Sequence, residues 1–176
     1  MTTYAEPDLF EKINGILVKM SRPKLNHIKI CGNIHHFLYD LIDEDRYHLL
    51  IEPNVFLDSE NTFYPDITIC DKSKIKHGDV YGAPELVIEV LSPSTGNRDL
   101  GEKFDNYFRL GVKECWIVDP YYLTVDIFAD KEKVRAYQLV LPNLTVEGTS
   151  EDEMVQSVIF DFSLRLVDVF RGIEYA

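Results

Sequence analysis

The chain has 176 residues and a net charge of −12, from 30 acidic and 18 basic side chains. Its length suits one domain, residues 1–176, and 45% apolar with 27% charged residues is the composition of an ordinary soluble protein. The acidic balance excludes a protein that holds nucleic acid mainly by a basic surface, because such surfaces bind by neutralising phosphates with lysine and arginine.

The sequence shows no segment that would direct the chain to a membrane. No apolar run approaches the length of a transmembrane helix, and the N-terminal residues have no basic region leading into an apolar stretch. We therefore expect a cytoplasmic protein with no membrane partner. The three cysteines argue against a disulfide framework, and Cys70 and Cys115 are expected as small core residues.

The first half of the chain predicts a hairpin, a helix and two strands. Asn14-Gly15 between two apolar runs is a strong signal for a hairpin turn. A helix is expected over 26–42, where apolar residues recur at helical spacing: Ile30, Ile34, Leu38 and Leu41. Two strands and then a polar loop are expected next: 47–57, 63–70 and 71–82.

The second half alternates strands with a long helix and ends in a short one. Strands are expected over 86–91, 114–119, 123–129, 133–140 and 157–162. The long helix runs from Arg98 to Leu110, with Gly111 as its C-cap, and the short helix lies within 164–173. This order of elements predicts an α/β domain with a mixed central sheet flanked by helices and an added antiparallel hairpin.

Two carboxylates fall within apolar segments, where burying an unpaired charge is energetically unfavourable. Glu89 lies in the middle of the apolar run 86–91, and Asp66 begins the apolar run that follows Pro65. If the two strands are neighbours, the carboxylates converge, and like charges that close need a cation between them. Carboxylate oxygens are hard ligands, so the sequence predicts a site for Mg²⁺, with Mn²⁺ as the alternative.

Lys103 is the expected partner of these acids. On a helical wheel it falls inside the apolar arc of the long helix, opposite a polar face that includes Asn106. Its ammonium can therefore point across the core face toward Glu89 and Asp66. A purely structural ion pair between Lys103 and Glu89 remains the alternative.

A zinc site is a second alternative for the first helix. His27, Cys31 and His35 are spaced by four residues and can line one helix face. A core position explains Cys31 better, and no fourth ligand is evident in the sequence.

Four stretches in the same order resemble a known family: "YPDITIC", "PELVIEVLSPST", "RDLGEKFDNYFRLGV" and "ECWIVDP". They are similar to the Uma-two family of restriction-endonuclease-like proteins, in the PD-(D/E)XK nuclease superfamily. The resemblance implies a restriction-endonuclease-like fold in which Asp66 and Glu89 bind the metal and Lys103 assists catalysis. Leu91 stands where the superfamily usually has its lysine. The backbone carbonyl of Val90 is a further candidate ligand.

The early part of the chain departs from the family pattern. Ile16 stands where the family usually has an acid, which puts retained activity in question. Glu11 matches a frequent early glutamate and His27 matches a histidine often found at the start of the first long helix. Both are additional candidate site residues.

The resulting hypothesis is a Mg²⁺-dependent endonuclease that hydrolyses DNA phosphodiester bonds. One alternative is a catalytically degenerate nuclease fold used for binding or scaffolding, and another is a hydrolase of small phosphorylated molecules. Tyr121 and Tyr122 are expected at the surface and could lie at a homodimer interface.

Overall fold

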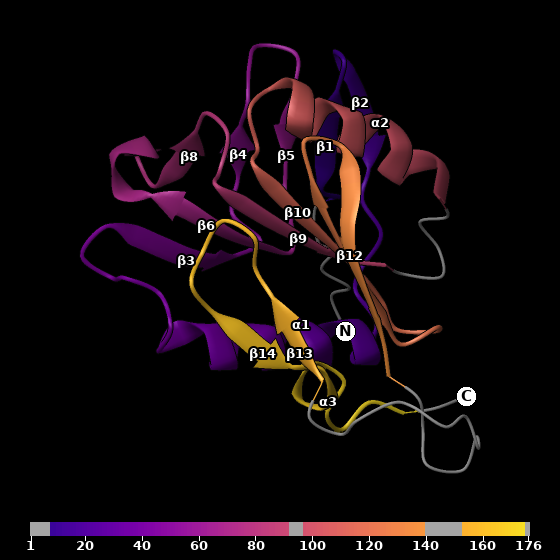
Figure 1. Cartoon of the computed structure of the whole chain (residues 1–176). Helices are drawn as coiled ribbons and strands as arrows, with labels where there is room; N and C mark the ends of the chain where they lie inside the picture. The colour runs from indigo at the N-terminus through magenta and orange to yellow at the C-terminus, as the bar shows by residue number, and fades with distance from the viewer. Residues whose placement is uncertain (1–7, 92–96, 140–152, 175–176) are drawn as a thin grey trace, which may run out of the picture.

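The fold was determined as a computed structural model (Figure 1). It describes residues 8–91, 97–139 and 153–174, and only the backbone of residues 97–100.

A six-stranded mixed sheet forms the centre of the molecule, with strand order β12-β11-β10-β9-β6-β3. Its strands are β3 (Tyr47–Ile51), β6 (Ile67–Asp71), β9 (Leu86–Val90), β10 (Glu114–Asp119), β11 (Thr124–Ala129) and β12 (Glu132–Gln138). Only β9 and β10 run parallel among these, and α2 (Asn97–Arg109) connects them. This confirms the predicted mixed sheet and the antiparallel hairpin, which is β11–β12.

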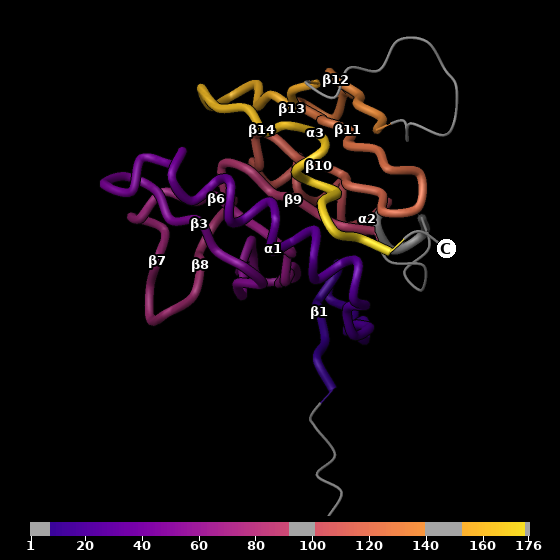
Figure 2. The backbone as a smooth tube through the Cα atoms, turned by 90° about the horizontal axis from the view of Figure 1, so that it is seen from below, coloured from indigo at the N-terminus to yellow at the C-terminus, as the bar shows by residue number. Residues whose placement is uncertain are grey.

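One face of the central sheet is covered by α1 (Leu25–Tyr39), α3 (Leu166–Val169) and a small hairpin. The hairpin consists of β13 (Met154–Gln156) and β14 (Ser163–Arg165). Figure 2 shows α1 lying across the sheet beside β3 and β9, on the same side as α3. The larger core lies here, because α1 and the strands each direct an apolar side to this interface: Ile30, Ile34, Leu38, Ile67, Ile88, Val90 and Trp116 are among its buried residues.

The other face is covered by α2 and by a second sheet, with strand order β2-β1-β5-β4-β8-β7. Its strands are β1 (Phe10–Ile13), β2 (Ile16–Lys19), β4 (Val55–Phe56), β5 (Thr62–Phe63), β7 (Ile75–Lys76) and β8 (Asp79–Tyr81). Ile13 and Phe63 from this sheet pack with Tyr107 of α2 and Val87 of β9 in a smaller core. As Figure 1 shows, β1 and β2 thereby lie next to α2.

Three predicted elements differ from the structure because part of each belongs to the second sheet. The predicted strand 47–57 is divided at Glu52, which has φ +47 and precedes Pro53. The predicted strand 63–70 is divided at Pro65, which has no N–H to donate to a ladder. The expected loop 71–82 contains a 3₁₀ turn, Lys72–Lys74, and the strands β7 and β8. Strands of two or three residues are too short to show a period in the sequence.

Two further expectations were wrong in detail. The segment 157–162, predicted as a strand, forms the turn between β13 and β14. The first helix, predicted over 26–42 with Leu41 on its apolar side, ends at Tyr39. Beyond its end Ile42 is buried, whereas Leu41 is 48% exposed. Gly111 has φ +108 and follows α2 as the predicted C-cap. No helix in the described part of the chain is long and apolar enough to cross a membrane.

Candidate active site

A buried lysine joins two carboxylates on the α2 face of the central sheet. The ammonium Nζ of Lys103 lies 2.6 Å from Oε1 of Glu11 and 2.9 Å from Oε1 of Glu89. All three residues are only 8% exposed. Three separate elements, β1, β9 and α2, thus place one positive and two negative charges together.

The local structure explains why these side chains meet. Alternation along β9 directs Val87 and Glu89 to the α2 face, while Ile88 and Val90 enter the larger core. Lys103 and Tyr107 are four residues apart on α2, so they share one face of that helix.

Tyr107 is a member of this cluster that sequence reasoning missed. Its hydroxyl donates a 2.5 Å hydrogen bond to Oε1 of Glu89, and its ring packs edge-on against Phe63. The wheel assigns Tyr107 to the apolar arc, where an aromatic ring is expected. The signal that could have found it was that a buried tyrosine hydroxyl needs a partner and that Lys103 lies one turn away.

When Glu89 is ionised, the two carboxylates of Glu11 and Glu89 outnumber the single ammonium of Lys103. Burial, helped by the neighbouring charges of Asp66 and Glu11, raises the pKa of Glu89 to about 7 against the opposing pull of Lys103. Burial disfavours the charged ammonium of Lys103, but Glu89 and Glu11 outweigh it and raise its pKa. Burial also raises the pKa of Tyr107, so its hydroxyl keeps the proton that it donates.

Asp66 lies one residue before β6, just beyond the end of the ladder that β6 forms with β9. Ile67 pairs with Ile88, so continuing the register by one residue places Asp66 opposite Glu89. Its Oδ2 accepts a 2.7 Å hydrogen bond from the backbone N–H of Val90. Pro65 ends the strand, and the Asp66 carboxylate takes up the next N–H of β9.

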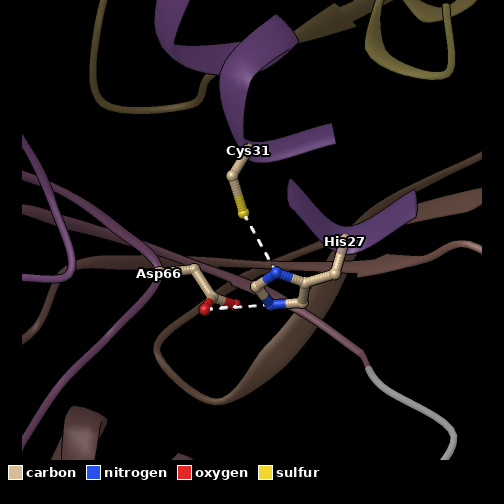
Figure 3. A group of neighbouring side chains, drawn as sticks. All are labelled: His27, Cys31 and Asp66. Atoms are coloured by element: carbon tan, nitrogen blue, oxygen red, sulfur yellow. Dashed lines mark hydrogen bonds and ion pairs between the residues drawn. The ribbon is translucent and has the colours of Figure 1, made fainter. Parts of the chain in front are cut away.

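His27 holds the other oxygen of Asp66, with 3.0 Å between Nε2 and Oδ1 (Figure 3). Burial opposes the charged form of His27, but the hydrogen bond and charge of Asp66 prevail, so the pKa of His27 is raised. Nδ1 of the same ring lies 3.7 Å from Sγ of Cys31, whose thiol pKa is raised by burial. The thiol is therefore neutral; it donates weakly to Nδ1 of a neutral His27 ring and accepts from Nδ1–H when the ring is protonated.

This arrangement does not favour the zinc alternative. Within the described ranges, His27, Cys31 and Asp66 form the only group of three potential ligands whose donor atoms lie within 4.8 Å of one another. The imidazole, however, presents a different nitrogen to Cys31 and to Asp66, so its two neighbours lie on two sides of the ring (Figure 3). His35 is not in this group and packs against Tyr39.

The structure distributes the predicted residues over two adjoining groups. Glu11, Glu89 and Lys103 form one, and Asp66 with His27 forms the other, next to the backbone of Val90. We expected Lys103 to stand over Asp66 and Glu89, but its second contact is Glu11. The difference arises because β1 belongs to the unpredicted second sheet.

Comparison with known proteins places the chain in a family. The profile of the Uma2 family, described as "Putative restriction endonuclease", matches residues 4–165. The chain belongs to the Uma2 family. The match includes all candidate site residues, which fall between Glu11 and Lys103.

Two relatives match most of this Uma2 chain. "Uncharacterized protein sll1609" of Synechocystis sp. (strain PCC 6803) is 26% identical over 144 residues, which is 78% of this chain and 80% of the relative. A crystal structure from Anabaena variabilis, described as "a putative nuclease belonging to DUF820", has a TM-score of 0.73. It is 19% identical and covers 92% of this chain and 89% of its own, which shows a shared fold.

The donor groups of this Uma2 chain fit a hard divalent cation. Asp66 and Glu89 offer carboxylate oxygens near the end of the β6–β9 ladder, each one residue beyond its last pair, Ile67 with Ile88. Burial without a full complement of positive charge makes the ionised form of Glu89 costly. Mg²⁺ uses one or two protein carboxylates and keeps several waters, so it needs no larger set of side chains.

Proposed function

We propose that this Uma2 protein is a Mg²⁺-dependent endonuclease that hydrolyses DNA phosphodiester bonds, with Mn²⁺ as an alternative cofactor. The observation that carries the proposal is the buried Lys103 between Glu11 and Glu89, beside the Asp66 ladder position. The descriptions of the Uma2 family and of the Anabaena protein support the same reaction class.

In this proposal Asp66, Glu89 and the backbone carbonyl of Val90 hold the ion. When bound, such an ion polarises a phosphoryl oxygen and lowers the pKa of a coordinated water. His27 keeps the Asp66 carboxylate in position through Oδ1, and Tyr107 does the same for Glu89 through Oε1.

Lys103 supplies the positive charge at the reacting phosphate. An ammonium has three donors, so Lys103 can keep Glu11 and turn another donor to a phosphoryl oxygen or to the attacking water. Charge that develops on the phosphate is stabilised more strongly in a buried site than in water. Glu11 acts here as the group that holds the lysine in the site.

Nicking of supercoiled plasmid DNA tests the proposal. We expect wild-type protein to nick the plasmid in Mg²⁺ and to lose this activity in EDTA. Asp66→Ala and Glu89→Ala should each abolish nicking, because each removes a proposed ligand. Glu132→Ala, which removes an exposed carboxylate from the edge strand β12, should leave it unchanged. Full activity of either site variant would refute the assignment.

A degenerate binding or scaffold protein is the second candidate. It is favoured by the hydrogen bonds that Lys103, Tyr107 and His27 make to the acids. These contacts give the carboxylates partners from within the protein, so the carboxylates do not require a metal ion. The departure at Ile16 also favours it, although that residue is 67% exposed at the start of β2. A cytoplasmic location and a homodimer remain predictions.

A further inference from the structure

A groove of about 550 Å³ lies next to the candidate site, between α2 and the strands β10 to β12. Apolar side chains form much of its wall: Leu91, Phe104, Ile117 and Phe128. Tyr122 lies at its rim with 64% of its surface exposed, and Asp119 and Asp126 add carboxylates to the lining.

The groove begins one strand away from Glu89. Ile117 of β10 is the register partner of Glu89, and Asp126 of β11 is the partner of Ile117. Neighbouring strands are about 4.8 Å apart. On the helix side, Phe104 directly follows Lys103. A group bound in the groove would therefore lie beside a phosphate at the site.

The negative charge of the groove suits a nucleobase and not the phosphate backbone of DNA. The whole chain carries −12, and two carboxylates face the groove. Asp119 accepts hydrogen bonds from the backbone N–H groups of Tyr121 and Tyr122, and Asp126 forms an ion pair with Lys133. A carboxylate has about four lone-pair sites, so both can also accept from base N–H groups.

We propose that this groove binds an unpaired nucleobase of the substrate, so that the protein prefers single-stranded DNA to continuous duplex. This inference rests on the proposed function. Bases in a duplex are stacked on both faces, whereas an unpaired base can stack on the exposed ring of Tyr122 and fill the groove against Phe104 and Phe128, whose rings stand at 78° to each other. Stacking on aromatic side chains supplies affinity that an acidic protein cannot obtain from phosphate neutralisation.

Fluorescence anisotropy in EDTA tests the groove without cleavage. The probes are a labelled single-stranded oligodeoxynucleotide of mixed sequence and the duplex of the same sequence. We expect the wild-type chain to bind the single strand at least tenfold more tightly. Equal affinity for the two, or no binding of the single strand, would overturn the proposal.

Substitutions at exposed tyrosines locate the binding surface. Tyr122→Ala should weaken single-strand binding roughly 5- to 100-fold, as loss of one base-stacking contact does, and Tyr122→Phe should restore it. Tyr39→Ala, which removes a 53% exposed tyrosine from α1 on the opposite face, should change it less than twofold. An unchanged affinity in Tyr122→Ala would contradict the groove as the binding surface.

The same assay separates this inference from the proposed function. Glu89→Ala should retain single-strand binding in EDTA while losing nicking. If wild-type protein binds the single strand but never nicks DNA, then the groove is supported and the endonuclease proposal fails. If it nicks a plasmid but binds duplex as tightly as single strand, the groove proposal fails alone.

Discussion

Lys103 shows how single residues decide the chemistry of this site. Lys103 is 8% exposed and its ammonium contacts two carboxylates, so removing either partner leaves a buried charge less compensated. Asp66 adds a further negative charge that raises the pKa of Glu89. When Glu89 ionises, its carboxylate and that of Glu11 outnumber the ammonium of Lys103, and in the proposed function a bound cation would neutralise this excess.

Stability should depend on pH through Glu89. Its pKa is raised from 4.5 to about 7, so between these values the folded chain keeps a proton that the unfolded chain has lost. The contribution of Glu89 is thus most favourable at low pH and declines as pH rises to about 7. Relative to Glu89→Gln, the wild-type free energy of unfolding should fall by on the order of 1 kcal/mol per pH unit in this window.

Urea unfolding of both proteins at pH 5, 6 and 7 measures this difference, because titrations common to both cancel. A difference that stays constant, or that grows as pH rises, would contradict the raised pKa.

At the residue scale, the sequence predicted charges in apolar surroundings but not all their partners. Glu89 and Lys103 were recognisable because each interrupts an apolar run or arc. Glu11 was a candidate only through the family resemblance, and its contact with Lys103 depends on how the second sheet packs. Asn106 was expected on the polar face of its helix, yet it is 4% exposed and donates hydrogen bonds to Asn14 and Asn61. It too is buried because the second sheet packs against α2.

At the scale of elements, the buried carboxylate of Glu114 explains why segment 157–162 is not the strand that the sequence predicts. Glu114 is fully buried at the start of β10 and accepts hydrogen bonds from Trp116 Nε1 and from Ser157 Oγ. It also accepts from the backbone N–H groups of Val158 and Ile159. These bonds hold segment 157–162 in a turn, although its apolar residues are typical of a strand. A local sequence pattern cannot reveal a partner more than 40 residues away.

Glu114→Gln should destabilise the protein by about 2 kcal/mol, because an amide nitrogen would replace one of the accepting oxygens and leave buried donors unpaired. Urea unfolding measures the loss, with Glu132→Gln as the exposed control. Plasmid nicking at a temperature where the variant is folded should equal that of wild type. A stability loss below about 0.5 kcal/mol would show that Glu114 does not anchor the C-terminal hairpin.

Longer elements were predictable because their signals are local. Helices α1 and α2 and strands β9 to β12 span four or more residues with clear periodicity, a cap glycine or a turn signal. The short strands β4, β5, β7 and β8 have two or three residues each, so only their tertiary contacts define them.

At the scale of the whole molecule, the two sheets bring distant segments to one site. The central sheet contributes Glu89, α2 contributes Lys103, and the second sheet contributes Glu11. Asp66 lies between β5 and β6, where the chain passes from one sheet to the other. The sequence predicted the central sheet and the convergence of the two acids if their strands are neighbours, but a fold with one sheet could not place Glu11.

The most direct test of the metal site is calorimetric titration of Mn²⁺ into the wild-type chain and into Asp66→Asn. Mn²⁺ substitutes for Mg²⁺ at oxygen ligands. We predict one ion per wild-type chain and no measurable binding to the variant, with Glu132→Gln behaving as wild type. Absence of binding to folded wild-type protein at millimolar Mn²⁺ would contradict a metal centre and leave the cluster as a structural ion-pair network.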